Sequence, residues 1–246
     1  MAIYIQSAGT SPDFDYSWQP EVPPLLNCVS GLIQSESPSL VLAKFANQFF
    51  LLITGLESPT KKDFAGRVIR HTIAWITDAN DANEKLLRAI ACQVLQERDD
   101  LISKVDQLIQ LDRKRGFTFE PSQFEDLGKS ILDSFTVESL ANDPDRTIKI
   151  AKNSQDLQIE LSLELQNYRL PHDYELLVVV TRIKSEDSLT QARIWRSLSD
   201  LVKSETWKTV SHKKKENSSP KKLTLVIALV LLLLVITIII LWTLRR

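Results

Sequence analysis

Residues 39–56 read SLVLAKFANQFFLLITGL, and this stretch decides the fold. Two runs rich in β-branched, aromatic and other apolar residues, 39–46 and 49–56, lie on either side of Asn47. Asn is a typical turn residue, and two strand-like runs around a short turn predict a β-hairpin. The first 56 residues are therefore expected to form a small sheet with one helix.

Further strands are expected on both sides of this hairpin. Residues 156–166 keep strict alternation, because apolar side chains at 157, 159, 161, 163 and 165 are separated by polar ones. That period is typical of a half-buried strand, although Leu, Glu and Gln individually prefer helices. The other predicted strands are residues 2–6, 66–77 (GRVIRHTIAWIT), 147–152 and 175–183 (ELLVVVTRI).

Apolar residues recur at helical spacing in four other segments, 24–35, 81–115, 122–135 and 188–202. The longest, 81–115, is expected to end at Arg113–Arg115, which suit the negative end of the helix dipole, with Gly116 as its C′ residue. Ser122 and Glu125 have the spacing of a capping box. The expected fold class is α+β: a mixed domain in which small β-sheets are packed by several helices.

The end of the sequence differs from the rest. Residues 223–244 (LTLVIALVLLLLVITIIILWTL) contain no charge, and a helix of that length spans about 33 Å against about 30 Å of hydrocarbon. We therefore expect a transmembrane helix. Trp242 lies near its far end, where an indole suits the lipid–water boundary.

Basic residues flank this apolar segment unequally. Five lysines precede it and two arginines follow it, so the positive-inside rule places the N-terminal domain in the cytoplasm and the C-terminus across the membrane. The expectation is a tail-anchored, single-pass protein with Cys28 and Cys92 as free thiols. The predicted membrane-surface residues are Trp207, Lys213, Lys214, Lys215, Lys221, Lys222 and Trp242.

Composition divides the chain in the same way. The formal net charge is −1, but residues 213–246 hold seven Lys and Arg against one Glu, so the remainder carries −7. We expect an acidic cytosolic domain over 1–202 with a subdivision near 117–121 left open, a Lys-rich linker over 203–222, the helix over 223–244 and a translocated tail at 245–246. Overall negative charge argues against nucleic acid as a partner.

Motifs of catalysis and metal binding are missing from the sequence. No GxGxxG, GxSxG, complete P-loop or HExxH occurs, and two isolated cysteines make no zinc knuckle. The sequence thus predicts no catalytic residue, metal or cofactor.

Two polar clusters remain as candidate sites. Asp63, Arg67, Arg70 and His71 lie at the start of an apolar strand, where paired guanidinium groups suit an anionic ligand; alternatively, Asp63 and Glu57 neutralise these cations on an exposed edge. The residues Asp13, Asp15, Tyr16 and Trp18 form either a contact surface or aromatic cover for the edge of the core.

Three functions fit these observations. The first is a membrane-tethered interaction or sensing module with the lipid bilayer and a protein as partners. The alternatives are a tethered enzyme or binding domain for an anionic small molecule, and a membrane effector of a bacterial defence or cell-suicide response. The sequence leaves oligomeric state open.

The layout resembles that of tail-anchored fusion proteins of the SNARE type, which place a small α/β domain before a coil and a basic juxtamembrane stretch. This resemblance covers the tail alone. SNARE-type proteins need a long heptad segment directly before the membrane, whereas ELLVVVTRI and Pro171 interrupt residues 150–200. The resemblance therefore assigns no family.

Overall fold

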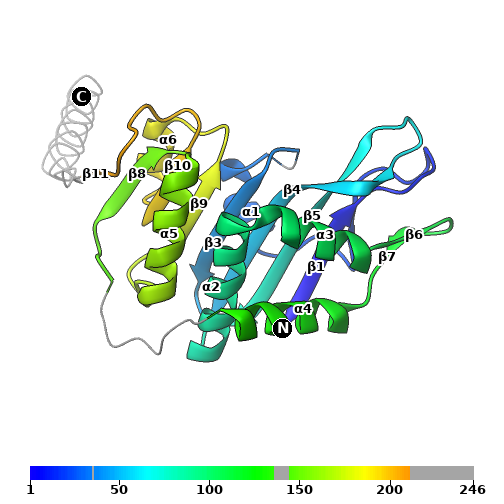
Figure 1. The fold of residues 1–246 in the computed structure, drawn as a ribbon, viewed down its shortest axis with the longest axis horizontal. Coiled ribbons are helices and arrows are strands. Elements are labelled where there is room, and N and C mark those ends of the chain that lie inside the picture. The colour runs from blue at the N-terminus through cyan, green and yellow to red at the C-terminus, as the bar shows by residue number, and fades with distance from the viewer. Residues whose placement is uncertain (35, 136–143, 211–246) are drawn as a thin grey trace, which may run out of the picture. The chain divides into compact units, whose positions relative to one another are not determined.

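A computed structural model describes residues 1–34, 36–135 and 144–210. Residues 1–210 form one compact unit, an α+β fold built on a nine-stranded mixed sheet with six α-helices in the described ranges. The strand order is β11-β8-β10-β9-β3-β4-β5-β1-β2 (Figure 1). The sequence expectation of an α+β fold is confirmed, but one large sheet replaces the several small ones.

One half of the sheet is wholly antiparallel. The hairpin predicted around Asn47 is present, and its second strand extends beyond the predicted end at residue 56. A bulge interrupts the pairing of this strand with β5 between Ile53 and Leu56. The strands of this half are β1 Ala2–Ser7, β2 Ser17–Gln19, β3 Ser39–Phe45, β4 Gln48–Lys62 and β5 Val68–Asp78.

The other half contains three parallel strands. The strand β10 lies between β8 and β9 and runs parallel to both, while β9 pairs antiparallel with β3 and joins the two halves. An antiparallel pair between β11 and β8 closes the outer edge. These strands are β8 Ile148–Lys152, β9 Leu176–Thr181, β10 Arg196–Ser199 and β11 Lys208–Val210.

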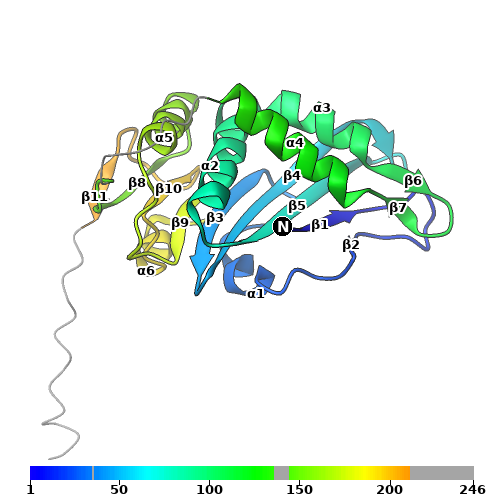
Figure 2. The same cartoon turned by 90° about the horizontal axis from the view of Figure 1, so that it is seen from below.

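Helices cover both faces of the sheet (Figure 2). Four of them lie on one face: α2 Asp81–Gln96, α3 Arg98–Leu108, α4 Pro121–Ser134 and α5 Gln155–Asn167. The short helices α1 Leu26–Val29 and α6 Glu186–Gln191 cover the other face. A small hairpin, β6 Gln110–Asp112 and β7 Gly116–Thr118, lies between α3 and α4 in the chain.

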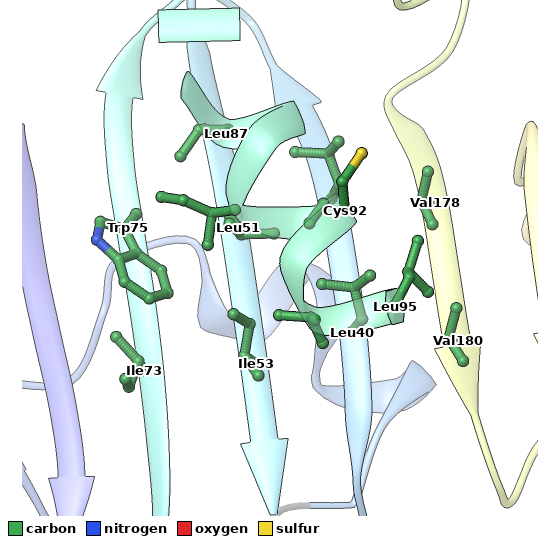
Figure 3. Close-up of a cluster of buried hydrophobic side chains, with 14 of the residues drawn as sticks. Leu40, Leu51, Ile53, Ile73, Trp75, Leu87, Cys92, Leu95, Val178 and Val180 are labelled. Atoms are coloured by element: carbon green, nitrogen blue, oxygen red, sulfur yellow. The ribbon is translucent and has the colours of Figure 1, made fainter. Parts of the chain in front are cut away.

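Strand periodicity explains why the core has two sides. Successive side chains of β4 point to opposite faces, so Leu51 packs under α2 while Leu52 packs on the α1 side. Figure 3 shows Leu87, Cys92 and Leu95 of α2 above β3, β4, β5 and β9. Because α2 covers strands from both halves of the sheet, the two halves share one hydrophobic core. The segment 117–121, a possible domain boundary from the sequence, lies inside this unit.

Three predicted elements are wrong. Residues 156–166 form part of helix α5 rather than a strand, so their alternating apolar residues occupy two opposite sides of a helix. The second half of the predicted helix 188–202 is the strand β10. The predicted helix 81–115 breaks at Glu97, and Gly116, with φ +79°, belongs to the β6–β7 hairpin rather than to a helix end.

Other expectations are confirmed in outline. The strands predicted at 2–6, 66–77, 147–152 and 175–183 are β1, β5, β8 and β9. The helix predicted from Ser122 is α4, although it begins at Pro121 and carries no side-chain cap. Only the middle of 24–35 is helical, as α1 and a following 3-10 turn, Ser30–Leu32.

The folded unit continues past residue 202, where the linker was expected to begin, because β11 adds residues 208–210 to the sheet. Linker residues 211–222, the predicted transmembrane helix and the translocated tail lie outside the described residues. Among the helices in the described ranges, none has the length and hydropathy needed to cross a membrane.

Candidate functional site

The two predicted polar clusters meet at one end of the antiparallel half of the sheet. Arg67 and Arg70, from the first cluster, and Asp15 and Tyr16, from the second, line one pocket of about 410 Å³. Gln6, Glu36 and Thr72 complete its lining. The residues come from β1, β5, the turn between β4 and β5, and the loops before β2 and β3. Pairing of β1 with β5 brings Gln6 and Thr72 together.

A backbone contact fixes the position of Tyr16. The amide N–H of Arg70 donates a hydrogen bond of 2.9 Å to the Tyr16 hydroxyl oxygen, although the residues are 54 positions apart. This bond anchors the N-terminal loop to β5. The Tyr16 side chain remains exposed, so its ring forms part of the open wall of the pocket.

Both arginines of the pocket already have acidic partners. Arg67 Nε lies 2.7 Å from Asp63 Oδ2, and Arg70 Nη2 lies 2.9 Å from Glu57 Oε1. Asp63 also accepts backbone hydrogen bonds from Ala65 and Arg67, which shape the turn between β4 and β5. These pairs match the alternative in which Asp63 and Glu57 neutralise the cations.

The pocket therefore holds charges of both signs. Its lining includes two guanidinium groups and the carboxylates of Asp15 and Glu36, with the two paired carboxylates beside them. A simple anion would meet two guanidinium groups but four carboxylates at this pocket. The arrangement suits a ligand that presents both an acidic and a basic group.

The remaining members of the predicted clusters lie elsewhere. His71 points to the opposite face of the sheet from Arg70, as neighbours on a strand must, and is fully buried. Asp13 is exposed and bonds locally to Ser11. Trp18 packs against the core on the α1 side, as aromatic cover for the edge of the core would require.

His71 lies at the centre of a buried polar network that the sequence did not reveal. Ser7 Oγ lies 2.9 Å from His71 Nδ1, and Asp106 Oδ1 lies 3.3 Å from His71 Nε2. Asp106 also accepts a hydrogen bond of 2.6 Å from Thr60 and pairs with Lys61 Nζ at 3.0 Å. The network joins β1, β4, β5 and α3.

The electrostatics of this network define its protonation state. Burial lowers the pKa of His71 from 6.5 to about 4, against the opposing effect of its hydrogen bond with Asp106. Burial alone would raise the pKa of Asp106, but hydrogen bonds from Ser58, Thr60, Lys61 and His71 lower it to about 2. At neutral pH the imidazole is therefore uncharged and donates from Nε2 to the carboxylate, while Nδ1 accepts from the Ser7 hydroxyl.

Ser7, His71 and Asp106 have the residue types of a hydrolytic triad, but their placement fits a structural role. A nucleophilic serine must reach its substrate, and the Ser7 side chain is fully buried. Each polar group of the three has a partner within the network. The network stabilises the junction of α3 with the sheet.

Trp207, predicted to contact the membrane surface, contacts the folded unit. Its indole N–H donates to Glu160 Oε2 at 3.0 Å, and its ring packs partly against the core. Lys213, Lys214, Lys215, Lys221, Lys222 and Trp242 lie outside the described residues. Within those residues, no group of three or more His, Cys, Asp or Glu side chains has metal-binding geometry.

Comparison of the chain with protein-family models, curated proteins and solved structures gives no match.

Proposed function

We propose that this protein is a membrane-tethered interaction or sensing module, anchored through residues 223–244, whose acidic N-terminal domain binds a protein partner. The support for tethering is the run of 22 uncharged, mostly apolar residues preceded by five lysines. That run has the length and flanking charge of a single transmembrane helix. The N-terminal domain then faces the cytoplasm.

The observation that carries the binding function is the pocket at Tyr16, Arg67 and Arg70. Exposed ion pairs are held weakly, because solvent screens them and ordering long side chains costs entropy. The Arg70–Glu57 pair, with side chains 38% and 58% exposed, can therefore exchange partners with an incoming protein at small cost. Arg67 is 68% exposed, but the Asp63 side chain is only 7% exposed, so that pair is held more firmly. A surface segment of the partner with one acidic and one basic side chain can pair with both an arginine and a carboxylate of the pocket.

An anionic small molecule is the second candidate ligand. It is supported by the two guanidinium groups that line one pocket, since guanidinium binds phosphate or carboxylate in a bidentate manner. The four nearby carboxylates weigh against it, because an anion must overcome their repulsion. We therefore place a protein partner first.

Anchoring is tested by membrane extraction of the full chain with a C-terminal tag. The tagged protein is expected to resist alkaline extraction and to keep its N-terminal domain accessible to protease in sealed cytoplasmic-side-out vesicles. A variant with lysines at three positions within 226–240 is expected to be released. Release of the unmodified chain would contradict the proposal.

Partner binding is tested in gently solubilised membranes. A stoichiometric partner should be lost from the double variant Arg67→Glu/Arg70→Glu. Arg115→Glu is the control, because Arg115 is as exposed as Arg67 and is paired with Asp112 but lies outside the pocket. If the double variant keeps the partner, the pocket is not the site at which the partner binds. Recovery of a bound small anion in place of a protein would favour the second candidate.

A further inference from the structure

Helix α5 has two apolar sides, and only one of them faces the core. Leu157, Leu161 and Leu165 are at most 4% exposed and pack with the core cluster that includes α2. Ile159 and Leu163, one helical turn apart, are 40% and 47% exposed on the other side. The strict alternation of apolar residues produces this arrangement, because every second residue on a helix is turned by about 200°.

A groove lies beside these exposed residues. It has a volume of about 650 Å³ and lies between α5, the start of β8 and the segment before β11. Leu163, Tyr168 and Trp207 contribute apolar surface to its lining, and Tyr168 is 37% exposed. The hydrogen bond from Trp207 to Glu160 holds the wall opposite α5 in place.

Carboxylates border this apolar surface. Asp156 and Glu160 lie on the exposed side of α5, and in the described part of the chain neither has a basic side chain within 4 Å. Glu164 and Asp145, also at the groove, face the buried guanidinium of Arg196. Lys149, which lines the groove as well, pairs with Asp145 at 2.7 Å. The exposed side of α5 is therefore an apolar ridge with unneutralised negative charge beside it.

The negative charge beside the ridge determines which kind of partner can bind there. An anionic bilayer surface is repelled by Asp156 and Glu160. A second copy of α5 would bring the same carboxylates toward each other, which is unfavourable. A helix with apolar residues on one side and Lys or Arg beside them complements both the ridge and its charge.

We propose that Ile159, Leu163 and the adjoining groove bind a basic amphipathic helix of a partner protein. The ridge supplies two apolar contacts spaced i and i+4, which match one helical stripe of the partner. Asp156 and Glu160 pair with the basic residues of that helix. The inference rests on the proposed interaction function, but it uses a surface separate from the pocket at Arg67 and does not depend on that pocket.

The test uses the full chain in nanodiscs of zwitterionic phosphatidylcholine and a defined probe. The probe is a Leu/Lys helix of about 14 residues, roughly four turns, with one photoreactive diazirine on its leucine stripe. Cross-links are mapped by mass spectrometry. We expect them within 155–168 and near Trp207.

Variants assign the binding to the ridge. Leu163→Gln and, separately, Ile159→Gln should reduce probe affinity at least about tenfold, the effect expected if these two residues are the central apolar contacts of the interface. Leu201→Gln is the matched control, because Leu201 is 58% exposed and does not line the groove. The double variant Asp156→Asn/Glu160→Gln should weaken binding, and a Leu/Glu probe should not bind.

Three outcomes overturn the inference. Cross-links spread evenly over the domain, or equal affinity of Leu163→Gln and Leu201→Gln, would show that the ridge is not a binding surface. Rapid disulfide formation by Leu163→Cys between two copies, which blocks the probe, would assign the ridge to self-association. If Arg67→Glu/Arg70→Glu loses the partner of the pocket but cross-links the probe as before, the two surfaces act separately. If no partner binds at the pocket and the probe does not cross-link to the ridge, the proposed interaction function is wrong.

Discussion

Nε2 of His71 lies 3.3 Å from Oδ1 of Asp106, and both side chains are shielded from solvent. This contact attaches α3 to β5 across 35 residues of chain. It holds an uncharged imidazole against a carboxylate that also pairs with Lys61. The protonation of one buried residue is therefore coupled to the docking of a helix on the sheet.

The first prediction concerns pH. The folded-state pKa of His71 is about 4, below its ordinary value of 6.5, so between these values the unfolded chain binds a proton that the folded chain excludes. The free energy of unfolding should fall by about 3 kcal/mol as pH drops from 6.5 to 4 and should not depend on His71 above that window. Thermal unfolding in non-ionic detergent across this pH range measures how the free energy of unfolding depends on pH. His71→Gln should flatten it, whereas substitution of the exposed His172 should leave it unchanged.

The same substitution on the two sides of α5 should change the free energy of unfolding by very different amounts. Leu161→Ala removes buried methyl groups and should lower the free energy of unfolding by about 2–5 kcal/mol. Leu163→Ala alters an exposed side chain and should change it by less than about 0.5 kcal/mol. Chemical denaturation of the two variants compares them. Equal losses would mean that the exposed side of α5 is covered.

Gly55 adopts φ +64°, and a Cβ atom there would lie 2.5 Å from the backbone nitrogen of Pro38. Gly55→Ala should therefore destabilise the protein by about 1–3 kcal/mol through backbone strain and steric conflict. Gly31→Ala is the control, because a Cβ atom at Gly31 would meet nothing within 4 Å beyond its chain neighbours. Melting temperatures of the two variants give the comparison, and an unchanged value for Gly55→Ala would contradict the turn geometry.

Arg196 is fully buried in the parallel half of the sheet. Its guanidinium donates to both carboxylate oxygens of Glu164 and to the carbonyl of Thr147, and it stacks 4.3 Å from the Trp195 ring. Arg196→Met leaves these acceptors without a donor and should cost about 3 kcal/mol. Urea unfolding should show partial recovery when Glu164→Leu is added. Substitution of Arg146, whose pair with Asp173 is exposed, should have little effect.

The two cysteines should differ in reactivity. Cys28 is exposed and Cys92 is buried, and burial raises the pKa of the Cys92 thiol to about 11. Because the thiolate is the reactive species, iodoacetamide near neutral pH should modify Cys28 alone in the folded protein and both residues in urea. Mass spectrometry counts the adducts. Early modification of Cys92 would indicate local opening of α2.

Local patterns in the sequence predicted the antiparallel strands well. The hairpin at Asn47 depends on neighbouring residues only, and its strands are long and apolar. The alternation at 157–165 misled because it fits a strand and a helix exposed on one side equally well, and only packing on α2 decides between them. Trp195 and Leu198 were assigned to a helix because their spacing of three residues also fits one. The strand β10 reads RSLS and carries no strand pattern of its own, so only its pairing with β8 and β9 makes it a strand.

The candidate site was predictable only in part. The polar residues at 63–71 stood out against an apolar strand, and so did Asp15 and Tyr16, but nothing local indicated that Arg70 contacts Tyr16 across 54 positions. Ser7 and Asp106 carry no pattern at all, since strand pairing and helix docking bring them to His71. Long-range contacts of this kind depend on the whole topology.

The nine-stranded sheet ends on each side in a strand of three residues, β2 and β11. Unpaired edge strands are the usual starting points for one chain to extend its sheet into another, and short edges limit this. In the described part of the chain, these edges offer little backbone for strand exchange between copies held side by side at high density, apart from Ala2–Tyr4 of β1, which extend beyond the pairing with β2. The short edges therefore disfavour polymerisation through the sheet when many copies are crowded together.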